Sequence, residues 1–272
     1  MNHEFIPRAS SMGALLTQNR KVNLTDKQVD ELKELSNKVK LTDKQADRLM
    51  ELRAKRDAVP ELSETAKSEV QKYVLLNKYG IEQNVHTWQM EKGTINEPIG
   101  LEMAAKVYGW LDVQKIQKER VTNGWVTGEA DVVTDYLLAD IKCSADGTTF
   151  PWFKEKPDAG YVAQLQCYMW LYNRTESLLV YALTNTPEHL IYDLKTREYY
   201  RMCARPEFAH LSTDELEMLA EDKVRKAHTF DHIPIEKRLK SYVIEFDNNY
   251  VQRIKQAVTM ARAYYDEIYD QI

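Results

Sequence analysis

The sequence predicts an α/β or α+β fold, with helices flanking a mixed β-sheet. Amphipathic segments with helix-capping signals come first along the chain, and runs rich in β-branched and aromatic residues follow in its middle. Helical patterns then return toward the C-terminus. A chain of 272 residues is long enough to bury a substantial core, so we expect a single domain over residues 1–272.

Composition narrows the class of protein. Hydrophobic residues make up 43% and charged residues 29% of the chain, which excludes wholesale disorder and a fibrous chain. The longest apolar run, 178–183, is too short to span a bilayer, and the first residues lack the pattern of a signal peptide. Three widely spaced cysteines argue against a disulfide framework or a zinc site. We therefore expect a cytoplasmic protein with no membrane partner.

The formal net charge of −5 excludes a globally basic nucleic-acid-binding protein. It does not exclude a metal-dependent nuclease, because such an enzyme needs clustered carboxylates and can also carry local basic patches. One small basic patch, KRLK at 237–240, forms either a solvated face or a contact with DNA.

An internal duplication occupies residues 24–57. Residues 24–40 (LTDKQVDELKELSNKVK) and 41–57 (LTDKQADRLMELRAKRD) each begin with Thr-x-x-Gln, which is typical of a helix capping box. Apolar residues recur every three or four positions in both copies. We expect an antiparallel helical hairpin inserted into the main domain. Its closely balanced charges favour contact with a protein over contact with DNA.

Helices and strands are expected in the rest of the chain. Helices are expected over residues 63–80, 94–108, 158–172, 212–228 and 248–272, with Pro98 in the first turn of the second. Strands are expected over 125–133, 136–142, 177–183 and 241–246, with weaker signals at 191–193 and 199–203. The C-terminal region 210–272 is therefore expected to be mainly helical.

Carboxylates gather on the expected strand pair. If Val133 pairs with Tyr136 across a two-residue turn, Asp131 and Asp140 become diagonal neighbours on one face, roughly 7–8 Å apart. A divalent cation can bridge such a pair. The same register places Glu129 opposite Asp140 as a further acid.

Lys142 follows on the face that carries Asp140, because side chains alternate along a strand. A lysine beside a metal ion can orient or deprotonate the attacking water. The alternative interpretation is a salt-bridged, half-exposed hairpin with ordinary polar faces. Gln164 and Tyr168, four residues apart, share one helical face, and taken singly they are explained more simply as polar positions of a core helix.

Taken in order, four motifs resemble the PD-(D/E)XK nuclease superfamily. They are Glu97, G-x-x-Asp131, Asp140-x-Lys142 and Gln164-x-x-x-Tyr168. More narrowly, the chain is similar to the lambda-type phage 5′–3′ exonucleases, the YqaJ-like viral recombinases. The tract YVAQLQCYMWLYN carries most of this similarity, and RASSMGALLT, beginning at Arg8, resembles the N-terminal Arg/Ser segment of the family. The resemblance covers about residues 6–23 and 88–183.

The resemblance implies a restriction-endonuclease-like core and a role for each matching residue. Asp131, Asp140, the Ile141 carbonyl and Glu97 would bind Mg(II), with Mn(II) as an alternative, and Glu102 and Glu129 compete with Glu97. Lys142 would contact the nucleophilic water or the scissile phosphate, and Gln164 and Tyr168 would position Lys142 or the DNA backbone. Arg8 with Ser10 or Ser11 would hold a DNA phosphate.

The resemblance also implies a function. The chain would be a phosphodiester hydrolase that degrades one strand of linear duplex DNA from an end for phage recombination, in the cytoplasm of the host cell. Its implied partners are double-stranded DNA ends, further copies of itself in a ring-like homo-oligomer, and a single-strand annealing protein. The expected catalytic core spans residues 88–184.

The sequence departs from the lambda-type pattern in three respects. Asp140 stands where those enzymes often have Glu, the 24–57 hairpin is additional, and the chain after about Pro187 shows no resemblance. Two other functions therefore stay open, a structure-specific or restriction-type endonuclease and a non-catalytic DNA-binding or scaffold protein. Outside the motifs, Trp152 and Phe153 either stack on bases or anchor a loop.

Overall fold

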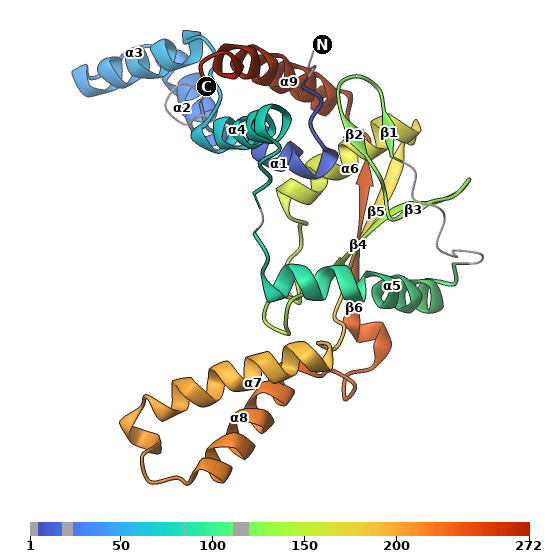
Figure 1. Cartoon of the computed structure of the whole chain (residues 1–272). Helices are drawn as coiled ribbons and strands as arrows, with labels where there is room; N and C mark the ends of the chain where they lie inside the picture. Colours follow the sequence, from blue (N-terminus) through green and yellow to red (C-terminus); the bar gives the residue numbers. More distant parts are fainter. Residues whose placement is uncertain (1–4, 18–23, 84, 111–119) are drawn as a thin grey trace.

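The computed structural model describes residues 5–17, 24–83, 85–110 and 120–272. Its centre is a four-stranded mixed sheet (Figure 1) in the order β3 (Val132–Val133), β4 (Leu138–Cys143), β5 (Glu176–Ala182), β6 (Leu239–Glu245). β4 and β5 are parallel, and the outer pairs are antiparallel. A small antiparallel pair, β1 (Val121–Thr122) and β2 (Thr127–Gly128), lies apart from this sheet. The expected mixed α/β architecture is confirmed.

Helices cover both faces of the sheet. α6 (Ala159–Tyr172) connects β4 to the parallel β5 and is apolar on nearly all sides, because it packs between the sheet and α1 (Met12–Leu15) and α9 (Asn248–Tyr269). α5 (Trp88–Tyr108) covers the opposite face. A Cβ atom on Gly100 would lie 3.0 Å from the Ile141 side chain, so glycine lets α5 approach β4 closely.

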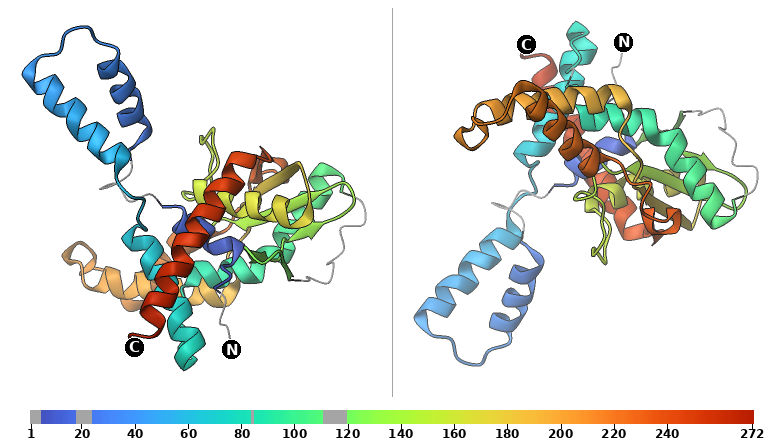
Figure 2. Two further views of the ribbon diagram at one scale, coloured as in Figure 1. Left: turned by 90° about the horizontal axis from the view of Figure 1, so that it is seen from above. Right: turned by 90° about the horizontal axis from the view of Figure 1, so that it is seen from below.

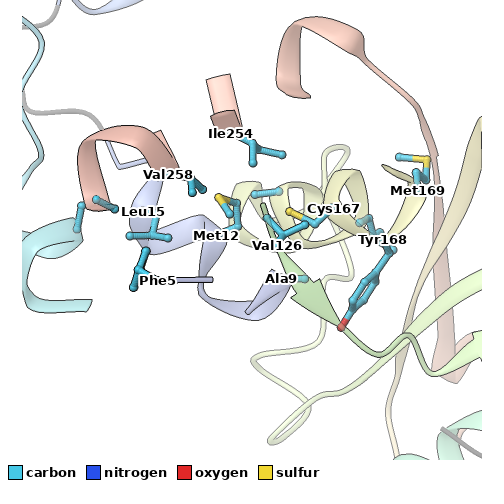
Figure 3. Packing of buried hydrophobic residues seen from close by; sticks show 14 of the residues in the cluster. Phe5, Ala9, Met12, Leu15, Val126, Cys167, Tyr168, Met169, Ile254 and Val258 are labelled. Atoms are coloured by element: carbon cyan, nitrogen blue, oxygen red, sulfur yellow. The ribbon is translucent and has the colours of Figure 1, made fainter. Parts of the chain in front are cut away.

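The largest apolar cluster joins the N-terminal segment to the helices around α6 (Figure 3). Met12 and Leu15 of α1 face Ile254 and Val258 of α9, and Phe5 lies beside them. α4 (Glu64–Tyr79), capped by the Ser63 side chain, completes this layer by packing along α9. Phe5 and the residues of α1 are therefore part of the core.

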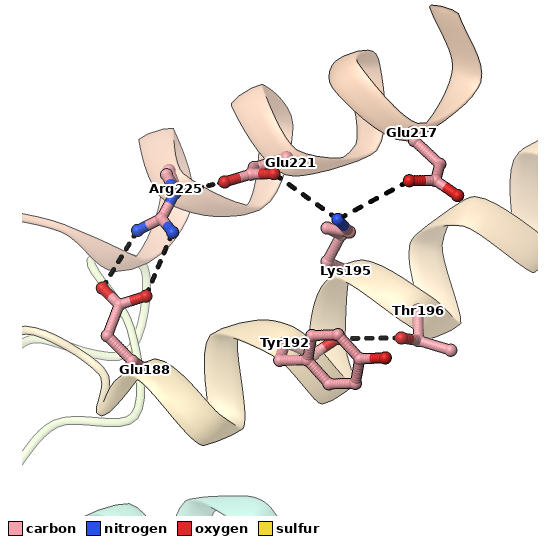
Figure 4. A network of polar contacts seen from close by, with 7 residues as sticks. All are labelled: Glu188, Tyr192, Lys195, Thr196, Glu217, Glu221 and Arg225. Carbon is pink, nitrogen blue, oxygen red and sulfur yellow. Dashed lines mark hydrogen bonds and ion pairs between the residues drawn. The ribbon is translucent and has the colours of Figure 1, made fainter. Parts of the chain in front are cut away.

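Two helical hairpins extend from this body (Figures 1 and 2). The first consists of α2 (Asp26–Ser36) and α3 (Asp43–Asp57), each with the expected capping box, and it confirms the predicted antiparallel hairpin. The second consists of α7 (Glu188–Cys203) and α8 (Thr213–His228). Figure 4 shows ion pairs between them, in which Arg225 binds Glu188 at 3.0 Å.

Short 3-10 turns occur at η1 (Ala9–Ser11), η2 (Pro206–Phe208) and η3 (Ile235–Arg238). No helix of the described residues is long and apolar enough to cross a membrane.

Several sequence expectations were wrong. The weak strand signals at 191–193 and 199–203 both lie in α7, whose helical spacing buries Ile191 and Met202. α5 begins at Trp88, capped by Thr87, so Pro98 lies inside the helix and not in its first turn. The expected strand 125–133 is divided into β2 and β3.

Candidate active site

The register of β3 and β4 brings two carboxylates face to face. Val132 pairs with Ala139 and Val133 with Leu138, so residues 134–137 form the turn. One step further along this register, Asp131 comes opposite Asp140. The expected two-residue turn and the diagonal relation between these residues were therefore wrong, although the two acids do meet.

The longer turn is held from a distant part of the chain. Arg174, just after α6, donates hydrogen bonds to the carbonyl oxygens of Asp135 and Thr134 at 2.9 and 2.6 Å. Within the turn, the Thr134 backbone nitrogen donates to the Leu137 carbonyl oxygen at 2.8 Å. In the observed register Glu129 does not lie opposite Asp140, where it was expected.

Asp140 is the buried centre of the cluster. It is 1% exposed, and its Oδ2 atom lies 2.6 Å from the Nζ atom of Lys142. The side-chain amide of Gln164 donates to Asp140 Oδ1 at 3.4 Å and to the Tyr168 hydroxyl at 2.8 Å. Gln164 and Tyr168 therefore share the side of α6 that faces Asp140, as their spacing of four residues predicts. Asp131 is anchored beside it by the backbone nitrogen of Ile141.

Burial and mutual repulsion dominate the electrostatics. Burial, followed by the charge of Asp140, raises the pKa of Asp131 to about 7. Burial also raises the pKa of Asp140 above its ordinary value, against the opposing effect of Lys142. Burial lowers the pKa of Lys142, but the nearby Asp140 and Asp131 outweigh that effect and raise it. Two adjacent carboxylates with one lysine form a site that would bind additional positive charge favourably.

The third acid is the least defined part of the site. Glu97 of α5 is half-buried, and its charge contributes to the raised pKa of both Asp131 and Asp140. Glu102 is exposed and lines a shallow cavity with Lys106 and other residues. The Oε2 atom of Glu129 lies 3.9 Å from the Nη2 atom of Arg120, with which it forms an ion pair. The electrostatic coupling therefore favours Glu97 over its competitors.

The candidate metal ligands do not form a complete metal site among the described residues. In the parts of the chain that the structure describes, no three His, Cys, Asp or Glu side chains are grouped closely enough to hold a metal ion. The donor set nevertheless consists of hard oxygen atoms, which Mg(II) and Mn(II) prefer, and of its two central carboxylates Asp140 is buried and Asp131 half-buried. A divalent cation therefore fits the chemistry of the Asp131–Asp140 pair.

The N-terminal Arg/Ser segment contacts β2, which precedes Asp131 along the chain. The backbone of Arg8 forms an isolated parallel β-bridge with Thr127 of β2. The Arg8 backbone nitrogen also donates a hydrogen bond to the Tyr73 hydroxyl at 2.8 Å. Arg8 and Ser11 line a cavity of about 480 Å³, together with Lys72 and others. Ser10 is exposed and is not among the residues that line this cavity.

Gly128 links the N-terminal segment to α6. A Cβ atom at this position would lie 2.7 Å from the Tyr168 ring and 3.0 Å from the Ala9 side chain. The glycine of the G-x-x-Asp131 motif therefore gives Tyr168 and η1 room to pack against β2. Figure 3 shows Ala9 and Tyr168 within this packing.

The sequence interpretation missed Tyr161. The Nζ atom of Lys142 lies over its ring, 5.1 Å from the centroid. Tyr161 precedes Gln164 by three residues, so the helical spacing that links Gln164 with Tyr168 also places Tyr161 on this side of α6.

The site is thus an acidic cluster with one lysine: Asp131 just before β3 and Asp140 and Lys142 on β4, with Gln164 and Tyr168 of α6 beside them. No protein-family model and no curated protein matched the chain. Among solved structures, it is similar to a phage-related exonuclease from Haemophilus somnus 129PT, with a TM-score of 0.65 and 23% identity over 99% of this chain and 97% of that chain.

A second solved structure is an alkaline exonuclease (LHK-Exo) from Laribacter hongkongensis. It has a TM-score of 0.49 and 14% identity, over 93% of this chain and 92% of that chain. The likeness to the Haemophilus somnus protein shows that the chain has the fold of that exonuclease. This fold agrees with the resemblance to the PD-(D/E)XK superfamily in the sequence.

Proposed function

We propose that this chain is a metal-dependent deoxyribonuclease, and more narrowly a 5′–3′ exonuclease that degrades one strand of linear duplex DNA from an end. The observation that carries the proposal is the pairing of the half-buried Asp131 with the buried Asp140, beside Lys142 two residues further along β4. The shared fold with a phage-related exonuclease supports the same conclusion.

Asp131 and Asp140 would hold Mg(II) or Mn(II), with the Ile141 carbonyl oxygen and Glu97 completing the ligand set. A divalent cation bound there would polarise a phosphoryl oxygen and lower the pKa of a bound water. Gln164 keeps the Asp140 carboxylate in place through its hydrogen bond.

The chain's own cations would act on the DNA. Lys142, which contacts Asp140, would donate to the scissile phosphate or orient the attacking water. Arg8 with Ser10 or Ser11 would hold a phosphate of the DNA end, because a guanidinium and hydroxyl groups form strong hydrogen bonds with phosphate oxygens.

The partners follow from the same resemblance. Single-stranded product would serve recombination through a single-strand annealing protein, and a ring-like homo-oligomer would keep the enzyme on its substrate. The α2–α3 hairpin is a candidate surface for either protein contact, since it extends from the body (Figure 2) and carries nearly balanced charges.

The test uses purified chain with linear duplex DNA labelled at either end and with closed circular DNA, in Mg(II), Mn(II) or EDTA. We expect metal-dependent loss of the linear DNA with the 5′ label released first. Lys142→Ala should abolish hydrolysis, whereas Lys226→Ala, which removes an exposed lysine on α8, should not.

Each other result decides between alternatives. Cutting of the circle would show an endonuclease, and early release of the 3′ label would reverse the polarity. No hydrolysis in any metal would overturn the enzyme proposal and favour a DNA-binding or scaffold role.

A further inference from the structure

Phe153 is the most exposed aromatic side chain in the described part of the chain, with 97% of its surface accessible. It lies in the loop between β4 and α6, the two elements that carry the candidate active site. A phenylalanine ring in open solvent contributes nothing to the core, and a single exposed apolar residue is common on protein surfaces, so the case for a role of Phe153 depends on its surroundings.

The loop that carries Phe153 is firmly held. The Asp146 carboxylate accepts hydrogen bonds of 2.9 Å from the backbone nitrogens of Thr148 and Thr149. The indole nitrogen of Trp152 donates to the Gly147 carbonyl oxygen at 2.6 Å, and its ring packs on the buried Phe150. Trp152 is therefore the loop anchor, and Phe153 is presented to solvent by a fixed backbone.

A row of rings connects this loop with Lys142. The Lys142 Nζ atom lies over Tyr161, whose centroid is 6.0 Å from that of Tyr181. Tyr181 is in turn 5.9 Å from Tyr242, and the Tyr242 hydroxyl donates to the Lys154 carbonyl oxygen at 2.7 Å. The three tyrosines are half-buried and pack against the edge of the main core.

Strand register puts the row on one face of the sheet. Lys142 of β4 pairs with Tyr181 of β5, and Tyr181 pairs with Lys240 of β6. Residues paired across strands point to the same side, and so does Tyr242, two residues after Lys240. The row therefore runs from the candidate active site across the sheet to the loop.

Lysines accompany the rings. Lys154 and Lys156 are exposed on either side of Glu155, directly after Phe153. Lys240 donates to the Trp152 carbonyl oxygen at 3.2 Å, and its Nζ atom is 5.6 Å from the Tyr242 centroid. Stacking rings interleaved with cations are the chemistry that binds single-stranded nucleic acid.

We propose that Phe153, the tyrosine row and the adjacent lysines form a binding path for single-stranded DNA next to the active site, with Phe153 stacked on a base. The proposal deepens the proposed function and rests on it for the substrate. The faces of bases inside a duplex are covered by their neighbours, so the ligand is an unpaired strand. Phe153 follows the partly exposed Trp152 and precedes the charged Lys154, so the loop exposes less apolar surface than the contiguous patch that a protein partner would need.

The test measures binding of a short fluorescent single strand, and of one containing 2-aminopurine, to the full chain in EDTA. Phe153→Ala should weaken binding about fivefold to 150-fold, the range that corresponds to ~1–3 kcal/mol of base–aromatic stacking. It should also remove the stacking-induced quenching of 2-aminopurine. Phe153→Trp should restore both signals.

The matched control is Tyr192→Ala, which removes an aromatic ring that is 66% exposed on α7. It should leave single-strand binding unchanged. Lys154→Ala combined with Lys156→Ala should weaken binding and reduce its salt dependence, because fewer counterions are released.

Hydrolysis assays in Mg(II) separate the two proposals. Unchanged binding by Phe153→Ala, with hydrolysis by the unmodified chain intact, would overturn the single-strand path and leave the nuclease standing. Binding that depends on Phe153 in a chain that hydrolyses no DNA would support the path and overturn the nuclease. Equal losses in Phe153→Ala and Tyr192→Ala would also overturn the path.

Discussion

Asp131 accepts a hydrogen bond from the backbone of Ile141, with 2.7 Å between its Oδ2 atom and the Ile141 nitrogen. β3 is paired only through Val132 and Val133, so this side chain takes the place of the next backbone bond at the edge of β4. The contact holds the Asp131 carboxylate next to Asp140. Asp131 therefore has a structural role that can be separated from its charge.

We expect Asp131→Asn and Asp131→Ala to differ in thermal stability without metal, and both to lose stabilisation by Mg(II). Asparagine keeps an oxygen for the Ile141 nitrogen, whereas alanine leaves a backbone donor without its partner, at a cost of about 1–3 kcal/mol. In thermal unfolding with EDTA, the melting temperature of Asp131→Asn should therefore be close to that of the unmodified chain, and that of Asp131→Ala should be lower.

Both substitutions should reduce or remove stabilisation by Mg(II). A cation at about 100 times its Kd would add ~2.7 kcal/mol to the free energy of unfolding of the unmodified chain. A full Mg(II)-induced rise in melting temperature in Asp131→Asn would contradict the assignment of Asp131 as a metal ligand.

Gly128→Ala should damage both the fold and the site. Its Cβ atom would lie 2.7 Å from the ring of Tyr168, which is only 4% exposed and has little room to move. Overpacking of this kind typically costs about 1–3 kcal/mol. The displaced ring would also disturb the Gln164 hydrogen bonds, so we expect slower hydrolysis in single-turnover assays.

Gly93→Ala is the matched control for that substitution. Gly93 lies inside α5 with open space around the position of its missing Cβ atom. Alanine should stabilise the chain by about 0.5–1 kcal/mol through its helix propensity. Urea denaturation that shows equal effects at Gly93 and Gly128 would contradict the close contact with Tyr168.

The structure shows which features could be predicted from local sequence. Both capping boxes of the first hairpin, at Thr25 and Thr42, depend on residues three positions away, and both formed as predicted. The turn between β3 and β4 is bound by Arg174, which is 40 residues from Thr134, and the sequence interpretation chose a shorter turn. Short-range patterns thus located the two acids, whereas their register involves contacts from a distant part of the chain that local patterns do not contain.

In α7, local sequence predicted the wrong type of secondary structure. Its aromatic and β-branched residues gave weak strand signals, but packing on α8 selected the helix, which buries Leu190, Ile191 and Met202 along one side. Lys92 gave no signal at all, because nothing near it in sequence indicates that Phe230 and Ala145 will enclose it.

Lys92 predicts a pH dependence of stability. It is fully buried, donates to the Ala145 carbonyl oxygen at 2.8 Å and lies 5.5 Å from the Phe230 centroid. Burial lowers its pKa from 10.5 to about 8, against the opposing charges of Cys143 and Asp146. Between these two pH values the unfolded chain binds more protons, so the folded state gains stability as the pH rises.

The gain attributable to Lys92 should reach about 3 kcal/mol between pH 8 and pH 10.5 and should be absent from Lys92→Met. Urea denaturation at several pH values measures it as a difference between the two chains, which cancels the contribution of groups that do not interact with Lys92. Lys106→Met, at an exposed position of the same helix, should keep the slope of the unmodified chain. A parallel pH profile for Lys92→Met would contradict the prediction.

The first hairpin should unfold independently of the body. Leu32, Leu35, Leu49 and Leu52 form a cluster of their own, separate from the main core that contains Leu165. Leu52 and Leu165 are both almost fully buried, so the same substitution to alanine compares the two cores directly. Leu165→Ala should lower the stability of the whole chain by about 2–5 kcal/mol.

Leu52→Ala should instead accelerate hydrogen exchange in residues 24–57 alone, because the cavity lies in a cluster that the main core does not share. Hydrogen exchange in α6 and β4 should stay as in the unmodified chain, and so should the hydrolysis of linear DNA. If Leu52→Ala lowered the main unfolding transition as much as Leu165→Ala, the hairpin would be part of the same cooperative unit. Unchanged exchange in α6 would instead identify α2 and α3 as an appendage that can bind a partner without altering the active site.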